Sequence, residues 1–391
     1  MKRKQQHKNK MSKATVALVG CDTYAEQRVY QAVEAGIKLL GGFTRFVKPG
    51  ERIVLKPNVL FGSNPDKCVS THPAVLKAVG RLLQQAEVDV YYGDSSGFGK
   101  CETNMRRAGL KAAANELGIK LADFDKGRAV THQEALLNKR FVIANGALDC
   151  DGLISLPKLK THGLTRITGA VKNQLGCIPG IRKSQYHVKM PSPYDFATML
   201  VDLTTLLRPR LYIMDGIIAM EGNGPRSGWP KHLDILLFSE DPVALDATAC
   251  KIIGLDPEFV PTSAPGEKAR LGTYHDENIE LVGEDIASFI DQDFAVVRRP
   301  PVAVRGGRWR ILARNWVCPQ PTIDTGVCTN CGTCVSHCPA TPKAVDWHTG
   351  DETIPPTFKY DRCIRCYCCQ EFCPEGAVTI RDTFIGKVLF H

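Results

Sequence analysis

The chain has 391 residues, of which 43% are hydrophobic and 23% are charged, and its formal net charge is +9. This length and composition predict a folded globular protein of two or three domains. Five of the positive charges lie in the first ten residues, and the sequence carries no nucleic-acid-binding module, so we exclude nucleic acid as a partner. No stretch approaches the roughly 20 apolar residues of a membrane span, and no signal peptide is recognisable, so we expect a cytoplasmic protein without a membrane partner.

Residues 1–12 are predicted to form a disordered basic tail, and residues 13–290 an α/β body. Short apolar runs alternate there with amphipathic helical stretches, which is typical of a mostly parallel sheet. A break near residues 146–151 predicts a division of this body into two lobes. The expected strands are Ala14–Gly20, Arg52–Lys56, Val88–Asp94, Leu153–Pro157, Leu211–Asp215 and Leu233–Phe238.

Polar and charged residues follow several of these strands. In doubly wound sheets ligands bind outside the carboxyl ends of the strands, so we expect these residues to line one pocket. The excess of lysines favours an anionic small molecule, a carboxylate or a phosphate. The alternatives are turn and cap residues, a solvated lysine face and a structural histidine. The candidate ligand-binding and catalytic residues are Lys56, Asn58, Asp94, Lys158, Lys160, His162, Lys172, Asn173, Asp215, Glu221 and Asn223.

Residues 291–321 are basic and contain proline and glycine, which predicts a linker on a surface. Residues 322–391 are predicted to be a small α+β domain, since they hold two runs with the pattern C-x2-C-x2-C-x3-C-P. The first run is CTNCGTCVSHCP and the second is CIRCYCCQEFCP.

Both runs resemble those of bacterial two-cluster ferredoxins, and the resemblance covers Asp324 to Asp382. It implies two [4Fe–4S] clusters, with the fourth cysteine of each run binding the other cluster. Zinc is the alternative for paired CxxC elements, but zinc does not require two matching runs that each end in proline. The implied ligands are Cys328, Cys331, Cys334 and Cys373 for cluster 1, and Cys363, Cys366, Cys369 and Cys338 for cluster 2. Cys368 and Cys318 are predicted to be free thiols.

The body resembles a known family from Val16 to Glu284. The motifs are LKPN, THPAV, GDSSGFG, PKLKTH, GAVKN, DGI with MEGNGP, and DPVALD, in that order. They are similar to those of the family called domain of unknown function 362, many members of which carry a two-cluster ferredoxin segment. This resemblance implies a fold and brings no mechanism.

A weaker resemblance is to the nickel-pincer lactate racemase family. His162, Lys172 and His187 are similar in order and spacing to its histidine, cofactor-binding lysine and second histidine. The sequence departs from that family in two respects. The segment PGI, residues 179–181, lies at a different offset from the histidine and the lysine, and no histidine after the third strand matches the catalytic histidine of the family. The resemblance therefore implies a pocket at these three residues and does not imply racemisation.

Together these features predict an iron–sulfur redox protein whose clusters relay electrons from a redox partner protein to the anionic ligand. As an enzyme it would be a ferredoxin-linked oxidoreductase, in which lysines stabilise negative charge and His162 or His187 moves the accompanying proton. One alternative is a non-catalytic electron-transfer or assembly partner that docks another protein. Another is a lactate-racemase-like enzyme with structural clusters.

Overall fold

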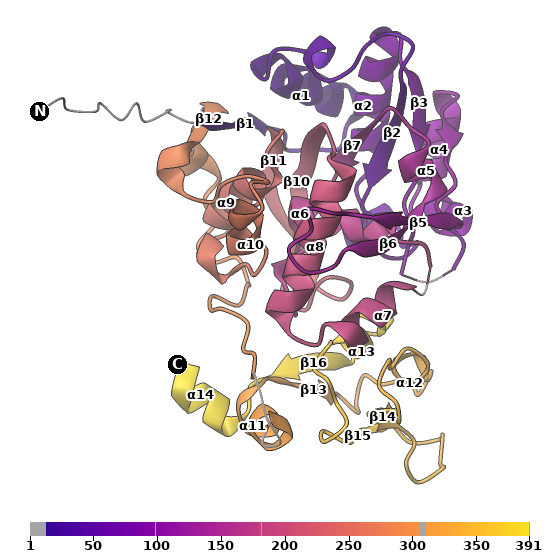
Figure 1. Cartoon of the computed structure of the whole chain (residues 1–391), viewed down its shortest axis with the longest axis vertical. Helices are drawn as coiled ribbons and strands as arrows, with labels where there is room; N and C mark the ends of the chain where they lie inside the picture. Colours follow the sequence, from indigo (N-terminus) through magenta and orange to yellow (C-terminus); the bar gives the residue numbers. More distant parts are fainter. Residues whose placement is uncertain (1–12, 98, 181, 305–309, 391) are drawn as a thin grey trace, which may run out of the picture.

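The structure is a computed structural model that describes residues 13–390 except 98, 181 and 305–309. The predicted basic tail, residues 1–12, lies outside this part of the chain. Figure 1 shows an α/β body at the top and a smaller domain below it, joined by a connector that follows α10 (Ser263–Lys268) and β12 (Ile279–Gly283). Among the described residues, none of the helices has the length and apolar character that crossing a membrane needs.

The body is built on one ten-stranded sheet. Its main path runs β12-β1-β11-β10-β7-β2-β3-β4, with β8 and β9 attached to β10. Only β11 runs antiparallel to both neighbours on this path, so the prediction of a mostly parallel α/β fold is confirmed. Besides β12, the strands of this sheet are β1 (Ala14–Gly20), β2 (Arg52–Pro57), β3 (Asp89–Tyr92), β4 (Lys120–Leu121), β7 (Gly152–Leu156), β8 (Lys158–His162), β9 (Arg166–Ile167), β10 (Leu211–Glu221) and β11 (Trp229–Ser239).

Residues 146–151, the expected boundary between two lobes, lead directly into β7. This strand pairs with β2 on one side and β10 on the other, so the sheet continues across the segment within the described chain. The expected division does not appear there as a break. The reason is that β7 is an apolar strand buried in the middle of the sheet, where it needs a neighbour on each edge. A separate hairpin is formed by β5 (Gly127–Thr131) and β6 (Arg140–Ala144).

Helices cover both faces of the sheet. Ala17 and Val19 of β1 pack in the same cluster as α1 (Glu26–Leu39), whereas Val16 and Leu18 pack with α9 (Pro242–Ile252). This alternation is what the period of two along a strand requires. The remaining helices of the body are α2 (Pro73–Gln85), α3 (Cys101–Arg107), α4 (Leu110–Glu116), α5 (Asn145–Leu148), α6 (Gly169–Asn173), α7 (Arg182–Lys189) and α8 (Pro193–Leu207).

In the described part of the chain, the smaller domain has two short antiparallel strand pairs. Gln320–Ile323 pairs with Val378–Arg381, and Val345–Asp346 pairs with Thr357–Phe358, so the expected ferredoxin-like α+β domain is confirmed. Part of the predicted linker, residues 291–321, belongs to this domain. The first helix of the domain begins at Arg310 and its first strand at Gln320. The elements are α11 (Arg310–Val317), β13 (Gln320–Ile323), α12 (Thr333–Ser336), β14 (Val345–Asp346), β15 (Thr357–Phe358), α13 (Cys368–Phe372), β16 (Val378–Arg381) and α14 (Phe384–Phe390).

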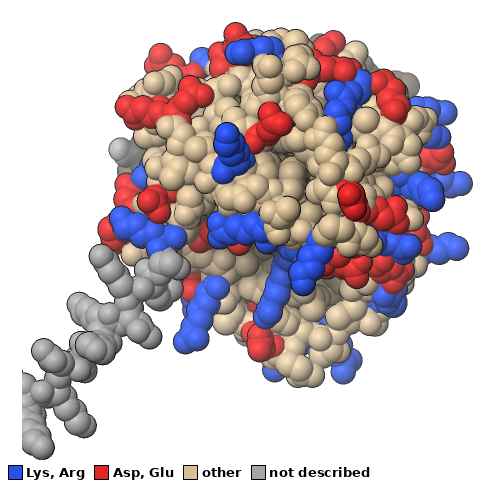
Figure 2. Space-filling view, turned by 90° about the horizontal axis from the view of Figure 1, so that it is seen from above, with Lys and Arg blue, Asp and Glu red and all other residues tan. Residues whose placement is uncertain are grey.

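The face of the body opposite the smaller domain is shown in Figure 2. Basic and acidic side chains interleave on it, with uncharged surface between them. Because nucleic-acid-binding surfaces gather one sign of charge, this face does not have that character.

Candidate functional site

The eight predicted cluster ligands divide between two small cavities in the smaller domain. Each cavity is surrounded by three cysteines of one run and the last cysteine of the other. This crossed arrangement is the one that the ferredoxin spacing implies. Four sulfur ligands around one cavity are the donor set of an iron–sulfur cluster, so the residues fit that group. The first set is Cys328, Cys331, Cys334 and Cys373, and the second is Cys338, Cys363, Cys366 and Cys369.

The two runs share one backbone conformation. Asn330 and Gly332 in the first run have φ of 58° and 67°, and Arg365 and Tyr367 occupy the equivalent places in the second with φ of 62° and 60°. A left-handed residue turns the chain sharply, which brings cysteines three apart to the same cavity. Such a conformation costs about 1 kcal/mol or more for a residue other than glycine, so Tyr367 is held there by its surroundings. Its hydroxyl donates to the carbonyl of Pro319.

A larger cavity of about 410 Å³ lies between the body and the smaller domain. The body contributes residues that follow β2 and β3 and residues of α6 and α7. The smaller domain contributes residues of its second and first cysteine runs. The principal lining residues are Asn58, Asp94, Lys172, Asn173, Lys183 and His187 from the body, and His337, Cys338, Cys368, Glu371 and Phe372 from the smaller domain.

A buried ion pair supports the floor of this cavity. The Lys56 amine lies 2.7 Å from Asp94 and donates to the Asn173 side-chain oxygen at 3.1 Å. Asn58 donates to the same oxygen at 3.1 Å. Burial raises the pKa of Asp94, and the nearby Lys56 opposes this effect. A β-carbon at Gly176 would overlap the Asp94 carboxylate, so the close approach of the backbone there requires glycine.

Within the described residues, the Lys172 amine and the His187 Nδ1 have no hydrogen-bond partner in the protein. Lys172 is half-buried, and among the described residues its amine has neither a hydrogen bond nor an ion pair. Burial lowers the pKa of Lys172, and Glu371 opposes this effect. His187 is 5% exposed, stacks on Phe196 at 4.3 Å, and has no hydrogen-bond partner for Nδ1 within the described chain. Burial lowers the pKa of His187 to about 4. Buried polar groups are normally satisfied, so the unsatisfied Nδ1 of His187 makes this part of the cavity the candidate site for a ligand.

Lys183 was missed by the sequence analysis. Its amine donates to the Ser95 hydroxyl at 2.8 Å and to the Ser96 carbonyl at 2.9 Å. Burial lowers the pKa of Lys183 to about 7. Lys183 and His187 are four residues apart on α7, and that spacing places two side chains on the same face of a helix. The spacing is the sequence signal that identifies Lys183.

His162 lies beside the cavity rather than on it. Its Nδ1 accepts from the backbone N–H groups of Leu164 at 3.0 Å and Thr165 at 3.2 Å. The remaining ring proton is therefore on Nε2, which contacts the Glu371 carboxylate of α13. Burial lowers the pKa of His162 to about 4, so this histidine is neutral at pH 7. Burial opposes ionisation of Glu371, but the contact with His162 and the charge of Lys172 outweigh it and hold the pKa of Glu371 below its usual range.

Besides Lys56, which lies beneath the cavity, five predicted ligand-binding residues lie outside it. Lys158 and Asp215 pair with each other at 2.9 Å, because β8 and β10 are neighbours and bring these two positions into register. Lys160 donates to the carbonyl of Val69 at 2.6 Å. Each of these three side chains is therefore engaged within the body.

The other two, Glu221 and Asn223, join segments. Glu221 accepts from the Ala295 N–H at 2.8 Å, in the connector. Asn223 accepts from Gln370 of α13 at 2.7 Å, and Gln370 also donates to the Gly224 carbonyl at 2.7 Å. Their polar groups hold the connector and the smaller domain against the body.

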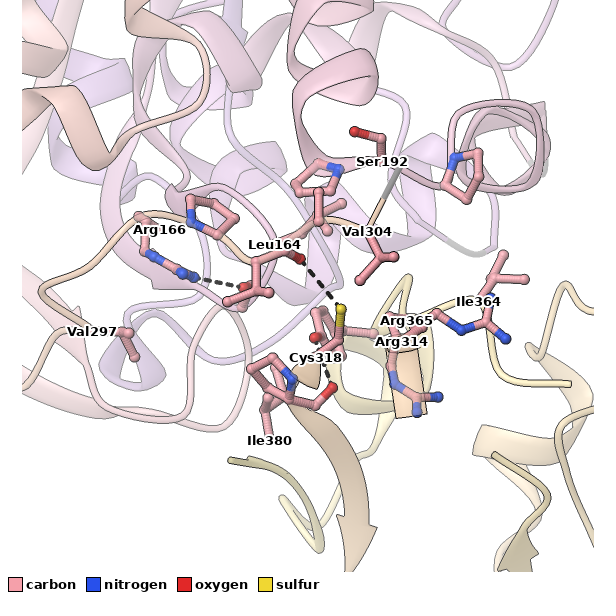
Figure 3. A pocket seen from close by; sticks show the side chains of 18 of the residues that line it. Leu164, Arg166, Ser192, Val297, Val304, Arg314, Cys318, Ile364, Arg365 and Ile380 are labelled. Carbon is pink, nitrogen blue, oxygen red and sulfur yellow. Dashed lines mark hydrogen bonds between the residues drawn. The ribbon is translucent and has the colours of Figure 1, made fainter. Parts of the chain in front are cut away.

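A second cavity, of about 130 Å³, lies where the body, the connector and the cluster 2 loop meet (Figure 3). Figure 3 shows Arg166 on one side of Cys318, and Arg314 and Arg365 on the other. Arg166 donates to the Arg299 carbonyl of the connector at 2.6 Å, and Arg365 donates to the side-chain oxygen of Asn315 in α11 at 2.8 Å. These two hydrogen bonds join segments that are far apart in the sequence.

Comparison with known proteins also separates the α/β body from the smaller domain. Residues 320–379 match the family model of a 4Fe-4S dicluster domain, so the smaller domain is an iron–sulfur domain. The thylakoid-associated protein sll1697 of Synechocystis sp. is 36% identical over 258 residues, which are 66% of this chain and 80% of that protein.

Two solved structures show low similarity. The lactate racemase apoprotein from Thermoanaerobacterium thermosaccharolyticum has a TM-score of 0.39 and 12% identity, over 62% of this chain and 57% of that one. A protein from Thermotoga maritima has a TM-score of 0.36 and 14% identity, over 59% of each chain. The chain thus spans less than two thirds of either structure.

The body itself is assigned by its own family model. Residues 53–251, which contain strands β2 to β11 and the body residues around the larger cavity, match the model described as domain of unknown function. The chain therefore belongs to the family of domain of unknown function 362, DUF362, and carries a 4Fe-4S dicluster domain after it.

Proposed function

We propose that this protein is a redox protein in which two [4Fe–4S] clusters serve an anionic small molecule in the larger cavity. The observation that carries the proposal is the position of Cys338. This cysteine lines both the larger cavity and the small cavity of the cluster 2 ligands. A small molecule in the larger cavity would thus lie next to a cysteine that binds cluster 2. A smaller domain that served only to dock another protein would not need this arrangement.

The residues that would hold the clusters are the two crossed sets of four cysteines. Bound there, the clusters would supply electrons one at a time. Cys331 of the first set is exposed, whereas Cys363, Cys366 and Cys369 of the second are buried. A redox partner protein would therefore approach the side of cluster 1, and the larger cavity lies on the side of cluster 2.

The body residues would bind the ligand and handle the proton. The Lys172 amine offers a positive charge to a carboxylate or a phosphate and stabilises negative charge that develops on it. The unpartnered Nδ1 of His187 is placed to hold or accept a proton at the ligand. His162 keeps Glu371 in place through Nε2, so its part is to position another residue. Lys183 is a second cation, and its pKa near 7 lets it give up its proton at neutral pH.

The experiment is anaerobic purification followed by mass spectrometry of the small molecules that denaturation releases. We expect an anionic compound in stoichiometric amount with the wild type, and its loss with Lys172→Met at unchanged iron content. Lys38→Met, which removes an exposed lysine of α1, is the matched control and should retain the compound. Iron-loaded wild type that releases no anion would favour the non-catalytic electron-transfer partner instead.

A further inference from the structure

Asn58 carries a hydrogen-bond acceptor that the proposed function leaves unused. Its side chain lines the larger cavity, and its Oδ1 is buried without a hydrogen-bond partner among the described residues. Native proteins rarely keep a buried polar atom unsatisfied, and each such atom needs a cause. Because this one belongs to the wall of the candidate site, it indicates a group on the bound molecule that completes it.

The orientation of the Asn58 amide follows from its neighbours. The Lys56 amine lies 3.1 Å from one side-chain atom of Asn173, and an ammonium group can only donate, so that atom is the oxygen. The other end of the Asn173 amide, Nδ2, donates to the Ser155 hydroxyl at 2.9 Å. The Asn58 atom that lies 3.1 Å from the Asn173 oxygen is therefore the donor, Nδ2. The unsatisfied atom of Asn58 is thus an oxygen, which can only accept.

The backbone of Asn58 is fixed as well. Its N–H donates to the Thr71 hydroxyl at 2.8 Å, and its carbonyl accepts from the Thr71 N–H at 3.0 Å. The Thr71 hydroxyl in turn donates to the carbonyl of Leu156, the last residue of β7. These bonds hold the amide in one orientation before any ligand arrives. An acceptor that is preorganised in this way favours a molecule that brings a donor to it.

The acceptor lies close to the positive charge of the cavity. Asn173, which accepts from the Asn58 amide, directly follows Lys172 in α6. Asn58 and Lys172 both line the larger cavity, so one small molecule can contact both. An ionised carboxylate has acceptors only, which suit the lysine and leave the Asn58 oxygen unpaired. The acid group alone therefore does not complete this wall of the cavity.

We infer that the anion of the larger cavity also carries a hydrogen-bond donor, a hydroxyl or an amino group, and that Asn58 selects for this donor. The inference rests on the proposed function, because it names the class of the anion proposed there. Lys172 binds the acid group, and the Asn58 oxygen accepts from the donor. A site built for such a donor discriminates against an analogue that lacks it, since the buried acceptor is then left unpaired.

The test is isothermal titration calorimetry of the iron-loaded full chain, purified without oxygen and dialysed. The probes are succinate, malate and aspartate. These three acids share one carbon skeleton, on which succinate has no further donor, malate has a hydroxyl and aspartate has an amino group. We expect malate or aspartate to bind about 10-fold to 100-fold more tightly than succinate. The tighter of the two identifies the donor as a hydroxyl or an amine.

A variant tests whether Asn58 is the source of the preference. Asn58→Leu should bind the three acids alike at unchanged iron content. Asn115→Leu, at an exposed position of α4, is the matched control and should keep the wild-type preference. A preference that persists in Asn58→Leu would overturn the role of Asn58. The comparison of the three acids within the wild type does not depend on the folding of any variant.

The inference and the proposed function can fail separately. Equal binding of the three acids to the wild type, lost in Lys172→Met, would overturn the inference and leave the anion site standing. Binding of none of the three acids would also overturn the inference. The proposed function is decided by a different measurement, the release of an anion from the purified protein.

Discussion

Lys56 and Asp94 come from the ends of two neighbouring parallel strands and pair at 2.7 Å, with exposed fractions of 0% and 2%. The pair lies below the larger cavity, and the backbone N–H of Val59 donates to the same carboxylate at 2.7 Å. It therefore fixes the segment after β2 that carries Asn58 to the segment after β3.

Removing one partner of this pair should be strongly destabilising. Lys56→Met leaves the Asp94 charge buried without its partner, and we expect it to lower the free energy of unfolding by about 3 to 5 kcal/mol. Lys56→Met with Asp94→Leu removes both charges and should recover much of this loss. Urea unfolding followed by circular dichroism measures both. A single variant as stable as Lys38→Met would show that the pair contributes nothing.

Iron analysis tests the cysteine assignment. Protein purified without oxygen should contain about eight irons and eight labile sulfides per chain, the content of two four-iron clusters. Cys369→Ser should lose about half of this iron, because that residue lines the small cavity of cluster 2. Cys368→Ser, one residue away, should keep all of it. Stoichiometric zinc in the anaerobic protein would refute the assignment.

Gly176 provides a test of the cavity floor. A methyl group there would collide with the Asp94 carboxylate and lie close to the Lys56 amine. We expect Gly176→Ala to destabilise the body by about 1 to 3 kcal/mol, the usual cost of overpacking, and to abolish retention of the anionic compound. The control is Asn115→Ala at an exposed position of α4, which should change neither quantity. A Gly176→Ala protein that keeps both its stability and its anion would show that the floor yields to the added methyl group.

Acid should weaken the fold through His187. Its folded pKa of about 4 is below the value of about 6.5 expected in the unfolded chain. The unfolded state therefore binds the proton first, and stability falls as the pH drops from about 6.5 to 4. Between pH 7 and pH 5 this one group should cost about 2 kcal/mol. His187→Gln should lose that much less over the same interval in urea unfolding, and the exposed His232→Gln should behave as the wild type. Equal losses in all three proteins would contradict the buried, neutral state of His187.

The sequence predicted the body residues at the cavity where they follow a strand or belong to one short motif. Asn58 and Asp94 follow parallel strands, whose ends share one edge of the sheet, and the motif GAVKN places Lys172 and Asn173 together. Strand order along the sheet is set by long-range pairing, which the local pattern does not encode. Lys158 and Asp215 were therefore expected to meet a ligand, whereas the neighbouring strands β8 and β10 pair them with each other.

The same local rules could not predict which residues of the smaller domain reach the larger cavity. Glu371 lies in the ferredoxin-like run, where the spacing of the cysteines identifies only the cluster ligands. Its contact with His162 depends on how the two domains pack. Cys368 was predicted to be a free thiol, and its position at the larger cavity follows from that packing as well.

Helix α13 has a consequence for how the protein matures. Its five residues contain one cluster ligand, Cys369, and three side chains of the larger cavity: Cys368, Glu371 and Phe372. The turn that would bind iron is thus also a wall of the proposed small-molecule site. Under the proposed function, protein deprived of iron should therefore bind the anion less well than iron-loaded protein, because both sites depend on the same turn of the chain.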